Sequence, residues 1–153
     1  MLVASFAAVA ASACTAAGSA KPPTILFVCQ SGTAKSPIAR ELLRRRAAER
    51  GIRVTAFSRG LALEDHVSPA LAARLKADGI NTAADTPRQL SPADWRSADL
   101  VIVFNPLPAG AKPARLRDWT DLPSVNDAYP AARAMLDQRI DRLLDEIAAG
   151  ASL

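Results

Sequence analysis

Cysteine and histidine are almost absent from this chain of 153 residues, which contains two cysteines and one histidine. This scarcity leaves no cluster of His, Cys and carboxylate side chains with the spacing of metal ligands, so we expect no metal site and no cofactor. Cys14 lies in an N-terminal segment that has the features of a cleaved leader, which would leave Cys29 alone. A lone cysteine cannot form an internal disulfide, and a free thiol that persists in an oxidising compartment indicates a chemical role.

Aromatic side chains are also scarce, at 5% of the residues, although half of the chain is hydrophobic. A chain of this length forms one domain, and we expect small aliphatic side chains to fill its core. No aromatic residue interrupts a run of five arginines, which is therefore typical of a solvated helix face rather than of a nucleic-acid surface. The run consists of Arg40, Arg44, Arg45, Arg46 and Arg50. We expect no nucleic-acid partner, and the net charge of +4 suits anionic substrates.

Charged residues are missing from the first twenty positions, and alanine is too frequent there for a stable membrane span. The segment 1–20 ends in small residues, as secretory signal peptides do, and Ala11–Cys14 resembles a lipoprotein processing site. We therefore predict a leader over residues 1–20 and a folded domain over residues 21–153. Processing of the leader would place the protein in the periplasm or on a lipid anchor, and without processing the protein would be cytoplasmic.

The remainder of the chain alternates between apolar, β-favouring runs and helical segments. Strands are predicted at 24–28, 53–58, 99–104 and 116–119, and helices at 37–50, 70–78, 92–97 and 130–149. Ser36 is expected to cap the first helix, with Pro37 at its first position. This order predicts an α/β fold, a three-layer, doubly wound, parallel four-stranded sheet with its site at the carboxyl edge.

The first strand leads into the most informative loop of the sequence. The strand ends at Cys29, and a loop of small residues then leads to Lys35 and the Ser36-Pro37 pair. In such a unit the amide groups of the loop and the positive end of the helix converge on one point, which is an oxyanion site. The same field favours the thiolate of Cys29, so the loop combines a nucleophile with a phosphate-binding site.

Two known phosphate-binding motifs are candidates for this loop. The segment from Gly32 to Ser36 partly matches the nucleotide-binding pattern G-x-x-x-x-G-K-[ST], but Cys29 and Ala34 stand where that pattern has glycines. The strand 99–104 is also followed by Asn105 rather than by an acidic residue. The alternative is the cysteine phosphatase pattern C-x5-R-S, whose spacing is kept by Cys29, Lys35 and Ser36 with lysine in place of arginine.

Residues 28–40 resemble the loop of the low-molecular-weight protein tyrosine phosphatase superfamily, which includes the arsenate reductases of that fold. The resemblance extends over about 24–149 and includes Gly79-Ile80, Arg88–Leu90, Ala98–Val101 and a loop with Trp, Asp and Pro before the last helix. It implies the fold described above. It also implies that the substrate is a phosphomonoester or another phosphate-type oxyanion. Protein phosphotyrosine is one candidate for the phosphomonoester.

The resemblance also implies a role for individual residues. Cys29 would attack phosphorus and form a phosphothiolate intermediate, and Ser36 would donate a hydrogen bond to the thiolate. The backbone amides of the loop would bind the equatorial oxygens of the phosphoryl group. The amides are those of Gln30, Ser31, Gly32, Thr33, Ala34 and Lys35. Asp121 would protonate the leaving oxygen, with Asp127 as the second choice.

Lys35 is the main departure from the family pattern. An ammonium keeps the positive charge of arginine but loses its two parallel hydrogen bonds, so we expect attenuated catalysis. Two alternatives stay open: a non-catalytic oxyanion-binding or regulatory protein, and an arsenate reductase that uses an external small thiol, because no cysteine follows Cys29. His66 is expected to be a surface residue, and Trp119 to contribute to packing.

Overall fold

The computed structural model describes residues 20–153. The predicted leader up to residue 19, including Cys14, lies outside the described residues and stays a prediction. No helix among residues 20–153 is both long enough and apolar enough to cross a membrane.

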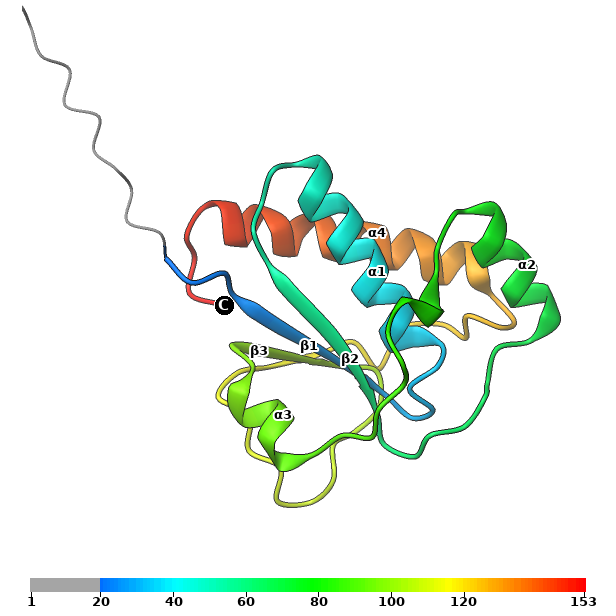
Figure 1. Cartoon of the computed structure of the whole chain (residues 1–153), viewed down its shortest axis with the longest axis horizontal. Helices are drawn as coiled ribbons and strands as arrows, with labels where there is room; N and C mark the ends of the chain where they lie inside the picture. The colour runs from blue at the N-terminus through cyan, green and yellow to red at the C-terminus, as the bar shows by residue number, and fades with distance from the viewer. Residues whose placement is uncertain (1–19) are drawn as a thin grey trace, which may run out of the picture.

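The centre of the domain is a sheet of four parallel strands in the order β2-β1-β3-β4 (Figure 1). The strands are β1 (Thr24–Cys29), β2 (Thr55–Gly60), β3 (Leu100–Val103) and β4 (Leu116–Asp118). Every pairing in the sheet is parallel, so each strand is joined to the next by a crossover. The α/β fold with a parallel four-stranded sheet is therefore confirmed.

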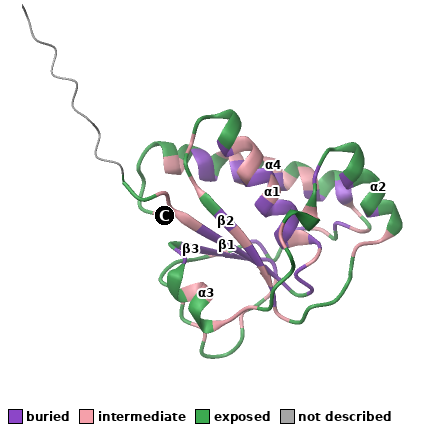
Figure 2. Cartoon of the chain, viewed as in Figure 1, coloured by how far each residue is buried: buried purple, intermediate pink, exposed green. Residues whose placement is uncertain are grey.

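Helices cover both faces of the sheet, which gives the three predicted layers (Figure 1). The helices are α1 (Lys35–Glu49), α2 (Pro69–Ala77), α3 (Pro92–Ser97) and α4 (Tyr129–Ala148), with a 3-10 turn η1 (Thr82–Ala84). Helices α1 and α4 lie side by side on one face, and α3 lies on the other. The central strands β1 and β3 between them are almost entirely buried (Figure 2).

The alternation of side chains along β1 determines which layer each residue faces. Ile25, Phe27 and Cys29 belong to the larger core beneath α1 and α4. Leu26 and Val28 belong to the smaller core on the face of α3. The strand therefore directs the Cys29 side chain toward the beginning of α1, where the predicted phosphate-binding loop ends.

Most element boundaries differ from the prediction by one or two residues, and two of these differences concern the site. Helix α1 begins at Lys35, with Ala34 as its N-cap residue, because the Ser36 hydroxyl contacts Cys29 Sγ and the Arg59 carbonyl instead of capping the helix. Strand β2 ends at Gly60 rather than at residue 58, since Gly60 still pairs with Cys29 at the end of β1.

Arg40 corrects the prediction of a solvated arginine face. Its side chain is only 2% exposed and is the largest fully buried side chain of the described residues. The guanidinium donates to Ser58 Oγ at 2.8 Å, to the Thr82 carbonyl at 3.1 Å and to Glu41 Oε1 at 2.7 Å. Sequence periodicity missed this role because the partners of Arg40 come from β2 and η1.

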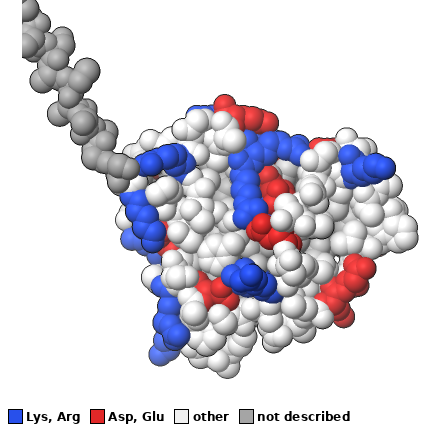
Figure 3. Space-filling view, in the orientation of Figure 1, with Lys and Arg blue, Asp and Glu red and all other residues white. Residues whose placement is uncertain are grey.

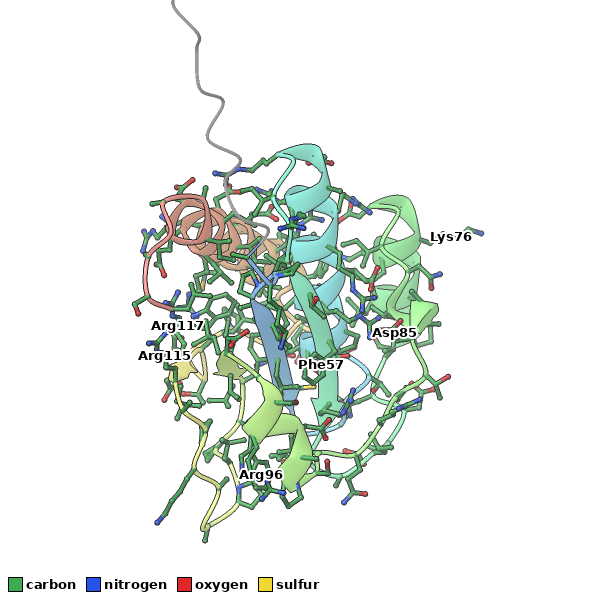
Figure 4. All side chains as sticks on the ribbon, turned by 60° about the vertical axis from the view of Figure 1, so that its left-hand side comes forward. Phe57, Lys76, Asp85, Arg96, Arg115 and Arg117 are labelled. Carbon is green, nitrogen blue, oxygen red and sulfur yellow. The ribbon has the colours of Figure 1, made fainter. Side chains whose placement is uncertain are left out.

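The other arginines of this run are half-buried or exposed, and Arg44, Arg46 and Arg50 pair with acidic side chains. Figure 3 shows basic side chains next to acidic ones on the face that it presents. Arg44 Nη2 donates to Oδ2 of Asp85, the residue labelled beside α1 in Figure 4, at 2.8 Å. Arg46 and Arg50 pair with α4, through Asp141 Oδ1 at 2.6 Å and Asp145 Oδ1 at 2.5 Å. These pairs tie α1 to its neighbours.

Replacement of Arg40 tests whether this buried guanidinium stabilises the fold. We expect Arg40→Met to lower the free energy of unfolding by about 2–4 kcal/mol, because its buried polar partners lose their donor. In the matched control Arg50→Met, the lost ion pair is largely exposed, and the change should stay below about 1 kcal/mol. Urea denaturation of both variants measures the difference, and equal effects would contradict this role of Arg40.

Candidate functional site

A cavity of about 300 Å³ lies at the carboxyl ends of the central strands. The loop that follows β1 forms its base, with Cys29 and Lys35 among the lining residues. Its wall comes from three other segments: the loop after β2, the second residue after β3, and the segment before α4. These contribute Glu64 and His66, Asn105, and Ser124 to Asn126. The cavity thus occupies the sheet edge where a parallel α/β fold binds ligands.

Cys29 is buried, with 3% of its surface exposed, and its sulfur has two polar neighbours. The Ser36 hydroxyl lies 3.0 Å from Sγ, and the Gly32 amide donates to Sγ at 3.3 Å. Hydrogen-bond donors directed at sulfur stabilise a thiolate, which is the nucleophilic form of cysteine. The predicted proximity of Ser36 to the sulfur is therefore present.

The amides of the loop divide into two groups, whereas the sequence suggested that all of them would face a ligand. Those of Gln30, Gly32 and Thr33 donate within the protein, to Asn105 Oδ1 at 2.8 Å, Cys29 Sγ at 3.3 Å and Ser31 Oγ at 3.4 Å. Within residues 20–153, no protein acceptor is found for the amides of Ser31, Ala34, Lys35 and Ser36. The second group remains available for an oxyanion at the start of α1.

Two glycines hold the loop against β2. Gly32 has a φ of +71°, a left-handed conformation that glycine adopts without steric cost. A Cβ on Gly32 would lie 2.9 Å from the Gly60 Cα, and a Cβ on Gly60 would lie 2.8 Å from the Gly32 Cα. Neither position accepts a side chain without displacing the backbone that presents the amides.

Lys35 lines the cavity and does not extend away from it. Its ammonium donates to the Leu122 carbonyl at 2.8 Å, which leaves two of its three N–H donors for a ligand. Burial lowers the pKa of Lys35, and the negative charge of Cys29 opposes that shift only in part. Lys35 thus links the cavity to the loop before α4.

The two predicted acids are not among the residues that line this cavity. Asp121 is exposed, and its Oδ2 accepts a hydrogen bond from Arg139 Nη2 at 2.6 Å. That hydrogen bond lowers the pKa of the Asp121 carboxyl. Asp127 is also exposed, and it accepts a hydrogen bond from the Ser124 hydroxyl at 2.7 Å. Both aspartates are therefore near the loop that forms the cavity wall, but their carboxylates have other partners.

Sequence reasoning missed six of the lining residues, which are Glu64, His66, Asn105, Ser124, Val125 and Asn126. His66 is exposed, as predicted, yet it lines the cavity. Its position depends on the path of the loop after β2, which no local pattern specifies. Asn105 could have been found, because a polar residue directly after a buried strand lies at the carboxyl edge of the sheet.

Trp119 contributes to packing, as expected. It is 4% exposed, and its ring lies 6.1 Å from that of Phe27 and 6.0 Å from that of Phe104. The aromatic cluster fixes the start of the segment that contains Leu122. Trp119 therefore helps to position this segment through core packing.

The lowered pKa of Lys35 predicts how phosphate binding responds to pH. In a Cys29→Ser background, which removes the thiolate, the affinity for inorganic phosphate should fall as the pH rises through the pKa of Lys35, below the ordinary lysine range. Deprotonation then removes the positive charge that attracts the anion. The added substitution Lys35→Arg should preserve the affinity over the same range, because guanidinium stays charged. Calorimetric titration measures both, and identical pH profiles would contradict the role of Lys35.

Comparison with known proteins agrees with this fold. A profile of the family "Low molecular weight phosphotyrosine protein phosphatase" matches residues 24–119. No curated protein sequence matches the chain.

Several solved structures are similar. The crystal structure of YfkJ from Bacillus subtilis is 19% identical, with a TM-score of 0.72, over 87% of this chain and 99% of its own. A low molecular weight protein tyrosine phosphatase from T. tengcongensis is 20% identical, with a TM-score of 0.65, over 81% of this chain and 99% of its own. A thioredoxin-dependent arsenate reductase from Corynebacterium glutamicum is 25% identical, with a TM-score of 0.65, over 86% of this chain and 65% of its own. With a profile match that covers more than half of the sequence, this chain belongs to the low molecular weight phosphotyrosine protein phosphatase family, a family of cysteine phosphatases.

Proposed function

We propose that this protein hydrolyses phosphomonoesters through a covalent intermediate on Cys29. The thiolate attacks phosphorus, so that a P–S bond forms while the P–O bond to the leaving group breaks and the leaving oxygen takes up a proton. Water then attacks the phosphothiolate, which releases orthophosphate and returns the thiolate. The proposal is supported above all by one observation: Cys29 lines the same cavity as a lysine and lies beside amides that have no protein acceptor.

The stabilisation of the phosphoryl group is divided among several donors. The amides of Ser31, Ala34 and Lys35 bind the equatorial oxygens, and the Lys35 ammonium adds a positive charge. The Ser36 hydroxyl stabilises the thiolate as it leaves phosphorus in the second step. Gln30, Gly32 and Thr33 maintain the shape of the loop through their own hydrogen bonds.

Lysine at position 35 attenuates this reaction. An arginine would bind two oxygens at once, whereas the ammonium of Lys35 shares its donors with the Leu122 carbonyl. One charge-assisted hydrogen bond is worth about 1.5–3 kcal/mol. If it acts only in the transition state, its loss slows the reaction by about tenfold to 100-fold. Turnover is then slow but measurable.

Arsenate reduction is the second candidate function, because solved structures similar to this chain include arsenate reductases. Arsenate has the shape and charge of phosphate and would bind the same amides. The sequence has no cysteine after Cys29 that could resolve an arsenic–sulfur adduct. An external small thiol would therefore have to act as the reductant.

Paired substitutions test the proposed hydrolysis. With p-nitrophenyl phosphate, Cys29→Ser should abolish turnover because it removes the nucleophile. Lys35→Arg should raise kcat/KM by about tenfold to 100-fold, because it restores the second hydrogen bond. Steady-state kinetics measure both variants, and calorimetric titration with phosphate verifies that Cys29→Ser retains the binding site.

The alternatives give different results in the same assays. Phosphate binding without any turnover, in the native protein and in Lys35→Arg alike, would contradict the phosphatase proposal and favour an oxyanion-binding or regulatory protein. Arsenate-dependent consumption of a small thiol in the absence of ester hydrolysis would instead favour the reductase.

A further inference from the structure

The phosphatase proposal needs a proton for the leaving oxygen, and the two predicted aspartates are engaged elsewhere. Asp121 accepts from Arg139, whose guanidinium also lies over the Trp119 ring at 5.5 Å from its centroid. Asp127 accepts from the Ser124 hydroxyl. To donate from either carboxyl, the protein would have to break these contacts and protonate the group first. A donor that already lines the cavity avoids both steps.

Four ionisable residues line the cavity: Cys29, Lys35, Glu64 and His66. Cys29 is the nucleophile, and the Lys35 ammonium is needed as a fixed positive charge at the base of the cavity. An ionised Glu64 would accept hydrogen bonds only, and its negative charge would oppose a phosphate dianion. An imidazolium both attracts the phosphoryl group and carries an N–H proton that it can donate, which a carboxylate lacks.

The backbone of His66 is tied to both sides of the cavity. Its amide donates to Thr33 Oγ1 at 3.1 Å, and Thr33 belongs to the loop that contains Cys29. Its carbonyl accepts from Asn126 Nδ2 at 2.8 Å, and Asn126 belongs to the wall before α4. The same asparagine accepts from the Ser68 amide at 2.9 Å. The backbone of His66 is thus held by hydrogen bonds within the cavity wall.

The preceding residues reinforce this position. The Thr33 hydroxyl donates to the Glu64 carbonyl at 2.8 Å, and the Glu64 amide donates to the Ser31 carbonyl at 3.3 Å. The segment from Glu64 to His66 is therefore attached to the phosphate-binding loop itself. A group fixed to this loop keeps its place relative to the bound phosphoryl group, which general acid catalysis requires.

We propose that His66 is the general acid that protonates the leaving oxygen when Cys29 attacks phosphorus. This inference rests on the proposed phosphatase function. The imidazolium transfers one proton to the oxygen as the P–O bond breaks. The resulting imidazole then removes a proton from the water that attacks the phosphothiolate, which restores the imidazolium. Nothing besides water is consumed in addition to the ester.

Leaving-group dependence tests this role, because a good leaving group departs without a proton. For phenyl phosphate, His66→Gln should lower kcat/KM by about 100-fold or more, and for 2,4-dinitrophenyl phosphate by less than about threefold. The matched control is Asp65→Asn, a neighbouring residue that does not line the cavity, and it should affect both esters equally. Calorimetric phosphate binding verifies the site in each variant.

A second variant guards against a merely structural effect. In His66→Ala, added imidazole should restore hydrolysis of phenyl phosphate and have little effect on the dinitrophenyl ester. Equal losses on both esters, with no rescue, would overturn the role of His66 as the acid but would leave the proposed phosphatase function in place. A loss restricted to phenyl phosphate in Asp121→Asn, but not in His66→Gln, would assign the proton to Asp121 instead. Failure of the native protein to hydrolyse even the dinitrophenyl ester would contradict the phosphatase function and, with it, the role of His66 as the general acid.

Discussion

The site depends on the contact between the end of β1 and the beginning of α1, where the Cys29 sulfur lies 3.0 Å from the Ser36 hydroxyl. Side-chain alternation along β1 directs Cys29 toward the layer that contains α1, and Ser36 is buried there. Gly32 and Gly60 then let the loop approach β2 so closely that no Cβ fits between them. This arrangement places the sulfur beside amides that have no protein acceptor. An anion-binding site is a direct consequence of the packing.

The segment before α4 forms part of the cavity wall, and three contacts connect it to the base and to the loop after β2. The Leu122 carbonyl accepts from Lys35, and Asn126 binds both His66 and the Ser68 amide. Aromatic packing of Trp119 and the ion pair of Asp121 with Arg139 hold the segment in place. The same contacts that shape the cavity engage Asp121 away from it. This arrangement is the reason that we assign the role of general acid to His66 and not to Asp121.

Much of the fold and part of the site could be predicted from the sequence, because local patterns determine them. Apolar runs and the order of elements specified the parallel sheet, and the spacing from Cys29 to Lys35 and Ser36 located the loop. What was missed depends on contacts between distant segments. Arg40 looked like its exposed neighbours until Ser58 and Thr82 provided partners, and His66 entered the cavity wall through Thr33 and Asn126. For Ser36 the predicted proximity to the sulfur is present, whereas its predicted role as the helix cap was wrong.

The central claim is that Cys29 accepts the phosphoryl group from an ester. The most direct measurement is rapid acid quenching of the native protein during turnover of 2,4-dinitrophenyl phosphate, followed by mass spectrometry of its peptides. The account predicts a single phosphoryl group on the peptide that contains Cys29, and no such adduct in Cys29→Ser. Ester hydrolysis that proceeds unchanged in Cys29→Ser, or a phosphoryl group found on another residue of the native protein, would contradict it.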